Sequence, residues 1–260
     1  MPNGTAPKVE AIDRALVLLS ALAEAGPLGA PLAELAERAG LAKPTAYRAL
    51  TTMRLRGFAE QTDGTGHYSL GPAAIALADR SDTPNNLAIS IHPALVALSR
   101  ASRELVHLGV LSGDRVLYVD KVEPERAIRV WSAVGQLVPV ASSSLGRALL
   151  AARNVPEAHL GSYLIDLPPG RAVTSSRLQQ AVQDARTLGY ALELGENEPD
   201  VACIGTAILR GGRPVAALSI TALAVRMTPE RQSELAALIR SEVPPLLPPG
   251  LSLMAPGGTS

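Results

Sequence analysis

Residues 31–58 read PLAELAERAGLAKPTAYRALTTMRLRGF and predict two short helices joined by a tight turn. The first helix opens at Pro31 and stops before Gly40, and the second begins near Pro44 and stops before Gly57. Apolar residues recur every three or four positions in both helices, at Leu32, Leu35, Ala36, Ala39, Ala46, Ala49, Leu50 and Met53. Two such helices form a helix-turn-helix, a motif whose second helix fits the major groove of DNA.

The charge of the same stretch is positive. The five charged residues from Arg38 to Phe58 are all cations, whereas the formal net charge of the whole chain is +0. These cations are Arg38, Lys43, Arg48, Arg54 and Arg56. A local concentration of positive charge is what DNA binding requires, so the pattern favours a DNA-binding surface here. The alternative is the solvated face of a winged helix that docks onto another protein.

The flanking segments predict a winged helix. Upstream, apolar residues recur at Val9, Ile12, Leu16, Leu19 and Leu22, which predicts a helix that begins near Lys8 after a few disordered residues. Downstream, residues 58–61 and 67–70 predict two strands around the polar, glycine-rich tip 62–66. This hairpin has the position of a wing. Because its tip carries no arginine, we expect its contribution to DNA affinity to be modest.

The composition excludes several classes of protein. At 260 residues the chain is long enough for two domains. Its longest apolar run, 216–225, is broken by Ser219 and Thr221 and is too short to span a membrane. The N-terminus shows no secretory signal, so we expect a cytoplasmic protein without membrane contact. The single cysteine, Cys203, excludes an internal disulfide framework, and the spacing of the histidines predicts no metal site. We therefore expect no metal and no cofactor.

After the wing, the pattern predicts a linker helix and an α+β domain. The expected division is a winged helix-turn-helix at 1–70, a linker helix at 71–84, a second domain at 85–246 and a disordered tail at 247–260. Helices are expected at 85–102, 145–151, 174–188 and 228–243, and strands at 104–111, 115–122, 128–131, 190–194, 202–209 and 215–221. Hairpins interleaved with helices predict an antiparallel sheet with helices packed on it. The tail is rich in proline and glycine and is expected to hold no structure.

Taken together and in this order, these segments resemble the IclR family of bacterial transcription regulators. The likeness extends over residues 8–243. It rests on LAKPTAYRALTTMRLRGFAE (41–60), YSLGP (68–72), VLYVDKVE (116–123), VGQLVPVASSSLGRALLA (134–151), LGYALELGENEPDVACIGTAI (188–208) and PVAALSITALAVRMTPE (214–230). The chain departs from the usual family sequence at Asp200, where glycine is common, and at Arg147, where lysine is usual.

The resemblance implies an N-terminal winged helix-turn-helix, a linker helix and a C-terminal effector-binding domain of profilin-like or GAF-like type. It also implies a homodimer or homotetramer that binds a palindromic double-stranded DNA operator. The implied effector is a small molecule, a small organic acid or an aromatic compound.

The family's DNA contacts fall at the exposed start of the second helix, which here carries Lys43, Thr45, Tyr47 and Arg48. Arg48 has the donors for a bidentate contact with guanine, and Lys43 and Thr45 could reach phosphates or base edges. Arg54 is a further candidate, although a cation in the last turn of a helix is also favoured by the helix dipole alone.

Candidate effector contacts begin with Ser142, Ser143 and Ser144, which precede a helix. The start of a helix suits a carboxylate, although serines there also serve as helix caps. Cys203 stands where the family has a pocket-lining residue, or it is simply a small buried side chain.

The other effector candidates lie on predicted strands. Ser219 and Thr221 share one strand face, because side chains alternate along a strand. Glu193 could accept a hydrogen bond from a hydroxylated effector, or it could face water.

The sequence therefore predicts an oligomeric, effector-responsive transcription regulator. We expect repression, because a dimer bound at a promoter blocks it without further contacts. The alternative is an enzyme that converts a small acid and uses the N-terminal unit for docking. No nucleophile elbow, metal triad, phosphate loop or acid–base pair supports that alternative, so we expect no catalytic residues.

Overall fold

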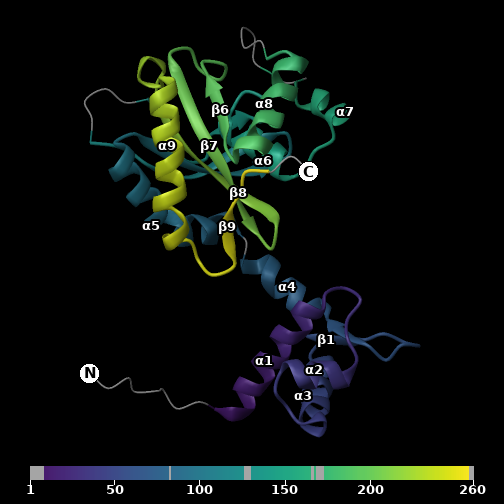
Figure 1. Ribbon diagram of the computed structural model, residues 1–260. Coiled ribbons are helices and arrows are strands. Elements are labelled where there is room, and N and C mark those ends of the chain that lie inside the picture. Colours follow the sequence, from purple (N-terminus) through teal and green to yellow (C-terminus); the bar gives the residue numbers. More distant parts are fainter. Residues whose placement is uncertain (1–8, 82, 126–129, 165–166, 168–172, 258–260) are drawn as a thin grey trace, which may run out of the picture. The chain divides into compact units, whose positions relative to one another are not determined.

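The computed structural model describes residues 9–81, 83–125, 130–164, 167 and 173–257 (Figure 1). The chain divides into two compact units, Met1–Thr83 and Pro84–Ser260, and each is described by itself. Among the described helices, none is both long enough and apolar enough to cross a membrane.

The first unit is a winged helix. Its elements are α1 (Glu10–Ala25), α2 (Leu32–Arg38), α3 (Lys43–Leu55), β1 (Ala59–Gln61), β2 (Tyr68–Leu70) and α4 (Pro72–Ser81). The apolar positions of α1, α2 and α3 meet in one core, which includes Leu18, Leu35 and Leu50, all without exposed surface. The antiparallel hairpin β1–β2 gains a third partner at Ala30, which bridges to Tyr68. The predicted start at Lys8 lies outside the described residues.

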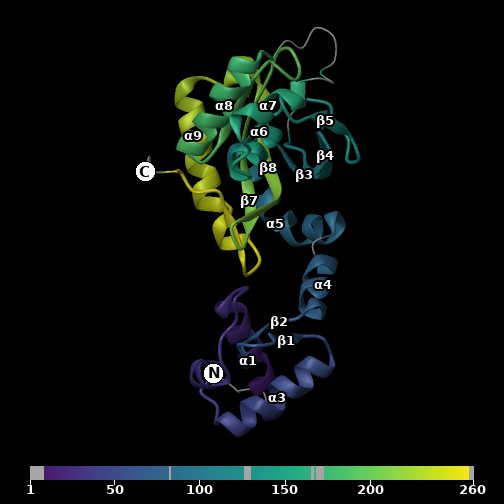
Figure 2. The same cartoon turned by 90° about the vertical axis from the view of Figure 1, so that its right-hand side faces the viewer.

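The second unit has an antiparallel sheet between two helical layers (Figure 1, Figure 2). Its strands are β3 (Leu105–Ser112), β4 (Arg115–Val122), β5 (Leu137–Pro139), β6 (Ala191–Leu194), β7 (Val201–Arg210), β8 (Arg213–Leu223) and β9 (Leu251–Leu253). Its α-helices are α5 (Pro84–Ser102), α6 (Ser144–Ala152), α7 (Glu157–Leu160), α8 (Ser175–Leu188) and α9 (Pro229–Glu242), and short 3-10 turns lie at Gly161–Leu164, Ala224–Arg226 and Pro244–Leu246.

The strand order is β5-β4-β3-β8-β7-β6, and β9 pairs with β7 beside β6. Strand alternation divides the sheet residues between the two helical layers. One face, with Leu108, Ile204 and Leu218, packs against α5 and α9. The other face, with Val116, Ala207 and Ala217, packs against α6 and α8.

The prediction of a strand at 128–131 is wrong for the two residues of this segment that the structure describes. Ile128 and Arg129 lie outside the described residues, and Val130 and Trp131 are not in a strand. Leu137–Pro139 pairs instead with residues 115–117 of β4. The alternation of apolar residues alone does not show which of two neighbouring segments pairs with the edge of β4.

The disordered tail expected at 247–260 is also wrong for residues 247–257. Leu251–Leu253 pair with Ile208–Arg210 of β7. The chain continues along the sheet, since Met254 N donates to Ala207 O at 2.9 Å and Gly257 N donates to Arg186 O at 2.7 Å. Because β6 pairs only with 202–205 of β7, the rest of that edge offers unpaired backbone groups, and these bind the tail despite its composition.

Candidate functional site

Helix α3 presents a polar, cationic face to solvent. Ala46, Leu50 and Met53 point into the core, which leaves Lys43, Tyr47 and Arg48 exposed and Thr45 half-buried. Pro44 lies in the first turn of α3, where its missing N–H costs no hydrogen bond. By helical periodicity, Arg48 points almost directly away from the core.

Two threonines extend this face by one turn and were missed from the sequence. Thr51 Oγ1 donates to Tyr47 O at 2.9 Å, and Thr52 Oγ1 donates to Arg48 O at 3.0 Å. Both side chains are exposed. Their spacing of four residues from Tyr47 and Arg48 was the signal that could have placed them on this face.

The cations of this unit differ in their partners. Arg38 forms an ion pair with Glu34 within α2, so its charge is partly neutralised. Arg54 Nη1 donates to Gln61 Oε1 of β1 at 2.9 Å. Arg48 makes no ion pair with a side chain in the described ranges, and its guanidinium is exposed. Of these three, Arg48 is therefore the one without a side-chain ion pair or hydrogen bond among the described residues.

A row of polar side chains crosses the sheet of the second unit on the face towards α6. Register pairs place Glu193 opposite Cys203, and Cys203 opposite Thr221. Cys203 Sγ lies 3.3 Å from Thr221 Oγ1, and Ser219 follows on the same face of β8. Residues from three strands, all named from the sequence, are thus adjacent.

His107 of β3 continues the row and was not identified from the sequence. Its Nδ1 lies 3.2 Å from Thr221 Oγ1, and its Nε2 lies 2.9 Å from Ser132 Oγ. Its ring stacks on Tyr118 with a centroid distance of 4.4 Å. Burial, with a smaller effect of Lys121, lowers the pKa of His107 to about 3. The imidazole is therefore neutral at physiological pH, and it adds hydrogen-bonding groups to the row without adding charge.

The chemistry of Cys203 and Glu193 is also set by burial. Burial raises the pKa of the Cys203 thiol well above its ordinary value, so the sulfur stays protonated and is a poor nucleophile. Burial likewise raises the pKa of Glu193, while hydrogen bonds from the Asn197 and Glu196 amides act in the opposite direction. Glu193 thus combines low exposure with a carboxylate held by backbone donors.

The three serines have different environments at the start of α6. Ser143 is the N-cap: its Oγ accepts from Gly146 N at 3.1 Å and donates to Pro139 O at 2.8 Å. Ser142 Oγ lies 3.5 Å from Asn197 Oδ1. Ser144 packs over β7, where a Cβ at Gly205 would lie 3.0 Å from its Oγ. The capping role expected for this cluster is found at Ser143, which leaves Ser142 and Ser144 for other contacts.

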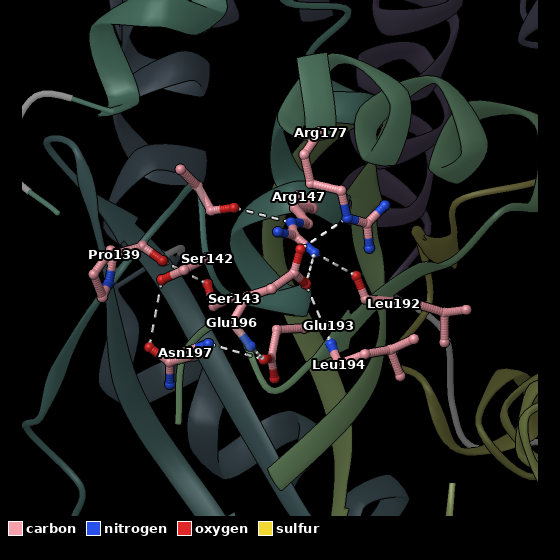
Figure 3. A network of polar contacts seen from close by, with 11 residues as sticks. Pro139, Ser142, Ser143, Arg147, Arg177, Leu192, Glu193, Leu194, Glu196 and Asn197 are labelled. Carbon is pink, nitrogen blue, oxygen red and sulfur yellow. Dashed lines mark hydrogen bonds and ion pairs between the residues drawn. The ribbon is translucent and has the colours of Figure 1, made fainter. Parts of the chain in front are cut away.

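Glu193 and Ser142 meet at Asn197 (Figure 3). Glu193 Oε1 accepts from the amides of Glu196 and Asn197, the latter at 2.8 Å. Its Oε2 is buried and has no hydrogen-bond partner in the part of the chain that the structure describes. An unpaired buried carboxylate oxygen is costly, so this atom has a strong preference for a donor.

Next to this point, Glu196 lies between two arginines (Figure 3). Its Oε2 is 2.7 Å from Arg147 Nη1, and its Oε1 is 2.8 Å from Arg177 Nε. Burial acts to raise the pKa of Glu196, but the hydrogen bond and charge of Arg147 outweigh it and lower the pKa. Arg147 also donates to Ala141 O and Leu192 O, so it joins the start of α6 to β6.

Comparison with known proteins decides the family. Residues 11–63 match the IclR helix-turn-helix domain, and residues 82–243 match the C-terminal domain of bacterial transcriptional regulators of the IclR type. The chain belongs to the IclR family of bacterial transcriptional regulators. The predicted α+β fold, with a winged helix-turn-helix and an effector domain built on an antiparallel sheet, is thereby confirmed.

Among IclR-family relatives, the acetate operon repressor of Salmonella typhimurium is 31% identical over 240 residues, which cover 89% of this chain and 86% of the repressor. The glycerol operon regulatory protein of Streptomyces coelicolor is 32% identical over 238 residues, which cover 89% of this chain and 92% of that protein. The crystal structure of the Thermotoga maritima IclR has a TM-score of 0.56 and 26% identity, and the match covers 92% of this chain and 98% of that one.

An IclR-family chain is a DNA-binding transcription regulator and not an enzyme, so the enzyme alternative is wrong. In the ranges that the structure describes, no group of three or more His, Cys, Asp or Glu side chains could hold a metal ion.

Proposed function

We propose that this regulator is a repressor that binds a palindromic operator as a homodimer or homotetramer and responds to a small organic or aromatic acid in its C-terminal unit. The observation that carries the DNA-binding part is the exposed face of α3, with Arg48 open to solvent. Because its target is chromosomal DNA, we place the protein in the cytoplasm.

In this proposal the first turns of α3 enter the major groove. Arg48 contacts a guanine with two donors, and Tyr47 contacts base edges or the backbone beside it. Lys43 and Thr45, at the N-terminal end of the helix, bind phosphates or base edges. The positive end of the helix dipole adds to the attraction of phosphate at this end.

An exposed apolar stripe on α1 supports the oligomer. Val9, which is the N-cap of α1, and Ile12 and Leu16 of the helix follow a spacing of three and four residues and are 62%, 58% and 58% exposed. Ile75 and Leu77 of α4 are also exposed, at 57% and 61%. Contiguous apolar side chains on a helix surface are typical of an interface. A second copy that covers the stripe would present two α3 helices, which is what two half-sites of a palindrome require.

The proposed effector site is the polar row together with the start of α6. The contacts we assign are Ser142, Ser144, Glu193, Cys203, Ser219 and Thr221, with Ser143 shaping the site as the helix cap. A carboxylate suits the start of α6, where serine hydroxyls and helix N–H groups converge on negative charge. A hydroxyl on the same molecule would donate to Glu193 Oε2, which is buried and lacks a partner in the described residues.

We propose that the regulator represses transcription, because a dimer bound at a promoter blocks it without needing further contacts. Effector binding would change the spacing of the two α3 helices, so that both half-sites could no longer be occupied together.

The test is fluorescence anisotropy of the purified protein on tiled duplexes from the DNA upstream of its gene, at several salt concentrations. We expect tight binding to one tile with a steep salt dependence, and release of that tile by one member of a panel of small hydroxylated and aromatic acids. Equally weak binding to every tile would contradict sequence-specific binding of this region. Binding that no member of the panel changes would contradict the proposed effector class.

A further inference from the structure

The side chain of Gln61 connects the recognition helix α3 to the wing. Its Oε1 accepts from Arg54 Nη1 at 2.9 Å, and its Nε2 donates to Gly66 O at 3.1 Å. Gln61 is the last residue of β1, and Gly66 lies on the other side of the wing tip. One amide group therefore makes both hydrogen bonds, one to the helix and one across the tip.

The backbone around this bridge is well defined. Phe58 N donates to Met53 O at 2.8 Å, which fixes the turn from α3 into β1. Two backbone hydrogen bonds close the tip. Thr62 N donates to His67 O at 2.8 Å, and Gly66 N donates to Thr62 O at 3.0 Å. A hollow lined by Thr51, Arg54, Gln61 and Thr62, among others, separates the exposed side of α3 from the wing. The hydrogen bond from Arg54 to Gln61 joins its two walls.

The charge of the wing makes the contact between Arg54 and Gln61 important. Residues 59–70 contain Glu60 and Asp63 but no lysine or arginine. A wing without lysine or arginine has few groups that can form ion pairs with phosphates, so other contacts must hold it in position against DNA. Arg54 brings a positive charge to its base, although it lies on the flank of α3 and not on the side opposite the core, where Arg48 lies.

We propose that Arg54 and Gln61 form a brace that holds the wing in its DNA-binding position, and that Arg54 acts on DNA binding through Gln61 and not by contacting DNA itself. This inference rests on the DNA-binding function of the family. It makes Gln61, which was not among the sequence-derived candidates, a positioning residue of the DNA-binding unit.

The brace has a measurable consequence. When it is lost, the wing samples several positions and must be ordered at the moment of binding, which lowers affinity. A hydrogen bond of this kind contributes a factor of about three to ten in an equilibrium constant. Because the two residues act as one unit, removing both should weaken binding no more than removing either.

The test uses the full-length protein with Arg54→Met, Gln61→Met and the double variant. Arg56→Met is the matched control, since it removes a neighbouring cation outside the bridge. Affinity and its salt dependence are measured by anisotropy on a duplex selected by the wild-type protein from a random library. Hydrogen exchange of residues 59–70 is measured without DNA, and the free energy of unfolding is compared across all variants.

We expect each single variant, and the double, to bind about three- to tenfold more weakly than wild type with an unchanged salt slope. Amides of the wing should exchange faster in all three, but not in Arg56→Met, while the free energy of unfolding changes little. The brace is overturned if Gln61→Met binds like wild type, if the two effects add in the double variant, or if Arg54→Met lowers the salt slope by about one, as a lost phosphate contact does.

The hydrogen-exchange measurement needs no DNA, so it tests the brace independently of the proposed operator binding. If the wild-type protein selects no duplex, the proposed operator function fails, whereas unchanged exchange of the wing in Arg54→Met and Gln61→Met overturns the brace alone.

Discussion

Nδ1 of His107 on β3 lies 3.2 Å from the hydroxyl oxygen of Thr221 on β8, although 113 other residues separate them in the chain. This contact joins β3 to the polar row of Glu193 and Cys203, and it completes a set of groups from four strands. Because the ring is buried, its protonation state is linked to the stability of the fold.

We expect the free energy of unfolding to fall as the pH falls from 6.5 towards 3. In this window the unfolded state protonates a histidine that the folded state keeps neutral, since burial lowers the pKa of His107 to about 3. The slope is about 1.4 kcal/mol per pH unit for one such group, and the contribution is complete above pH 6.5. Chemical denaturation at several pH values measures it.

Glu193 has a raised pKa and changes stability in the opposite direction, so the slope of His107 must be isolated by comparison. His107→Gln should lose the acid-dependent decrease between pH 6.5 and 4.5. Parallel curves for wild type and His107→Gln would contradict the buried, neutral histidine.

Replacing Glu196 by glutamine should be strongly destabilising. Arg147 has no exposed side-chain surface, and Glu196 is its ion-pair partner at 2.7 Å. Leaving a buried cation without its counter-charge costs about 3–5 kcal/mol. Arg177 pairs with the same carboxylate but is 38% exposed, so Arg177→Gln should cost no more than about 1 kcal/mol. Equal losses in the two variants, measured by denaturant titration, would contradict this assignment.

Two adjacent serines should separate a structural role from a binding role. Ser143→Ala removes the cap of α6 and the bond to Pro139 O, and should cost about 1–2 kcal/mol of stability. Ser142→Ala removes only a contact of 3.5 Å and should leave stability nearly unchanged while weakening effector binding. Thermal unfolding and effector titration of both variants make the comparison. A larger stability loss in Ser142→Ala than in Ser143→Ala would reverse the two assignments.

Arg48→Ala should weaken operator binding and relax the choice of sequence at one base pair. A bidentate contact with guanine is worth about 1–3 kcal/mol of discrimination. Arg14→Ala is the control, since Arg14 is paired with Glu10 on α1 at 2.6 Å. Anisotropy on the operator and on single-base variants gives both quantities. If Arg48→Ala keeps wild-type affinity and preference, the contact lies elsewhere on α3.

Local patterns were enough to predict much of the fold. Periodicity located α5 and α8, and the cap expected among residues 142–144 is found at Ser143. Alternation placed Ser219 and Thr221 on one strand face. These features depend on residues within one or two turns of each other, so the sequence records them directly.

The errors have a different physical origin. The tail at 247–260 is poor in local structure-forming residues, but an open edge of β7 binds Leu251–Leu253. His107 is one residue of an apolar strand, and only the pairing of β3 with β8 brings it next to Thr221. Arg54 was named for its charge, and only the fold shows that its guanidinium is bonded to Gln61.

For this protein, the sequence by itself determined the winged helix, the α+β class, the family and most of the candidate residues, because periodicity, helix ends and ordered motifs are local signals. Tertiary structure decided which candidates lie together and which hydrogen bonds they already make. The pairing of strands distant in the chain assembled Glu193, Cys203, Thr221 and His107 into one row, since strand register depends on contacts that no single segment encodes.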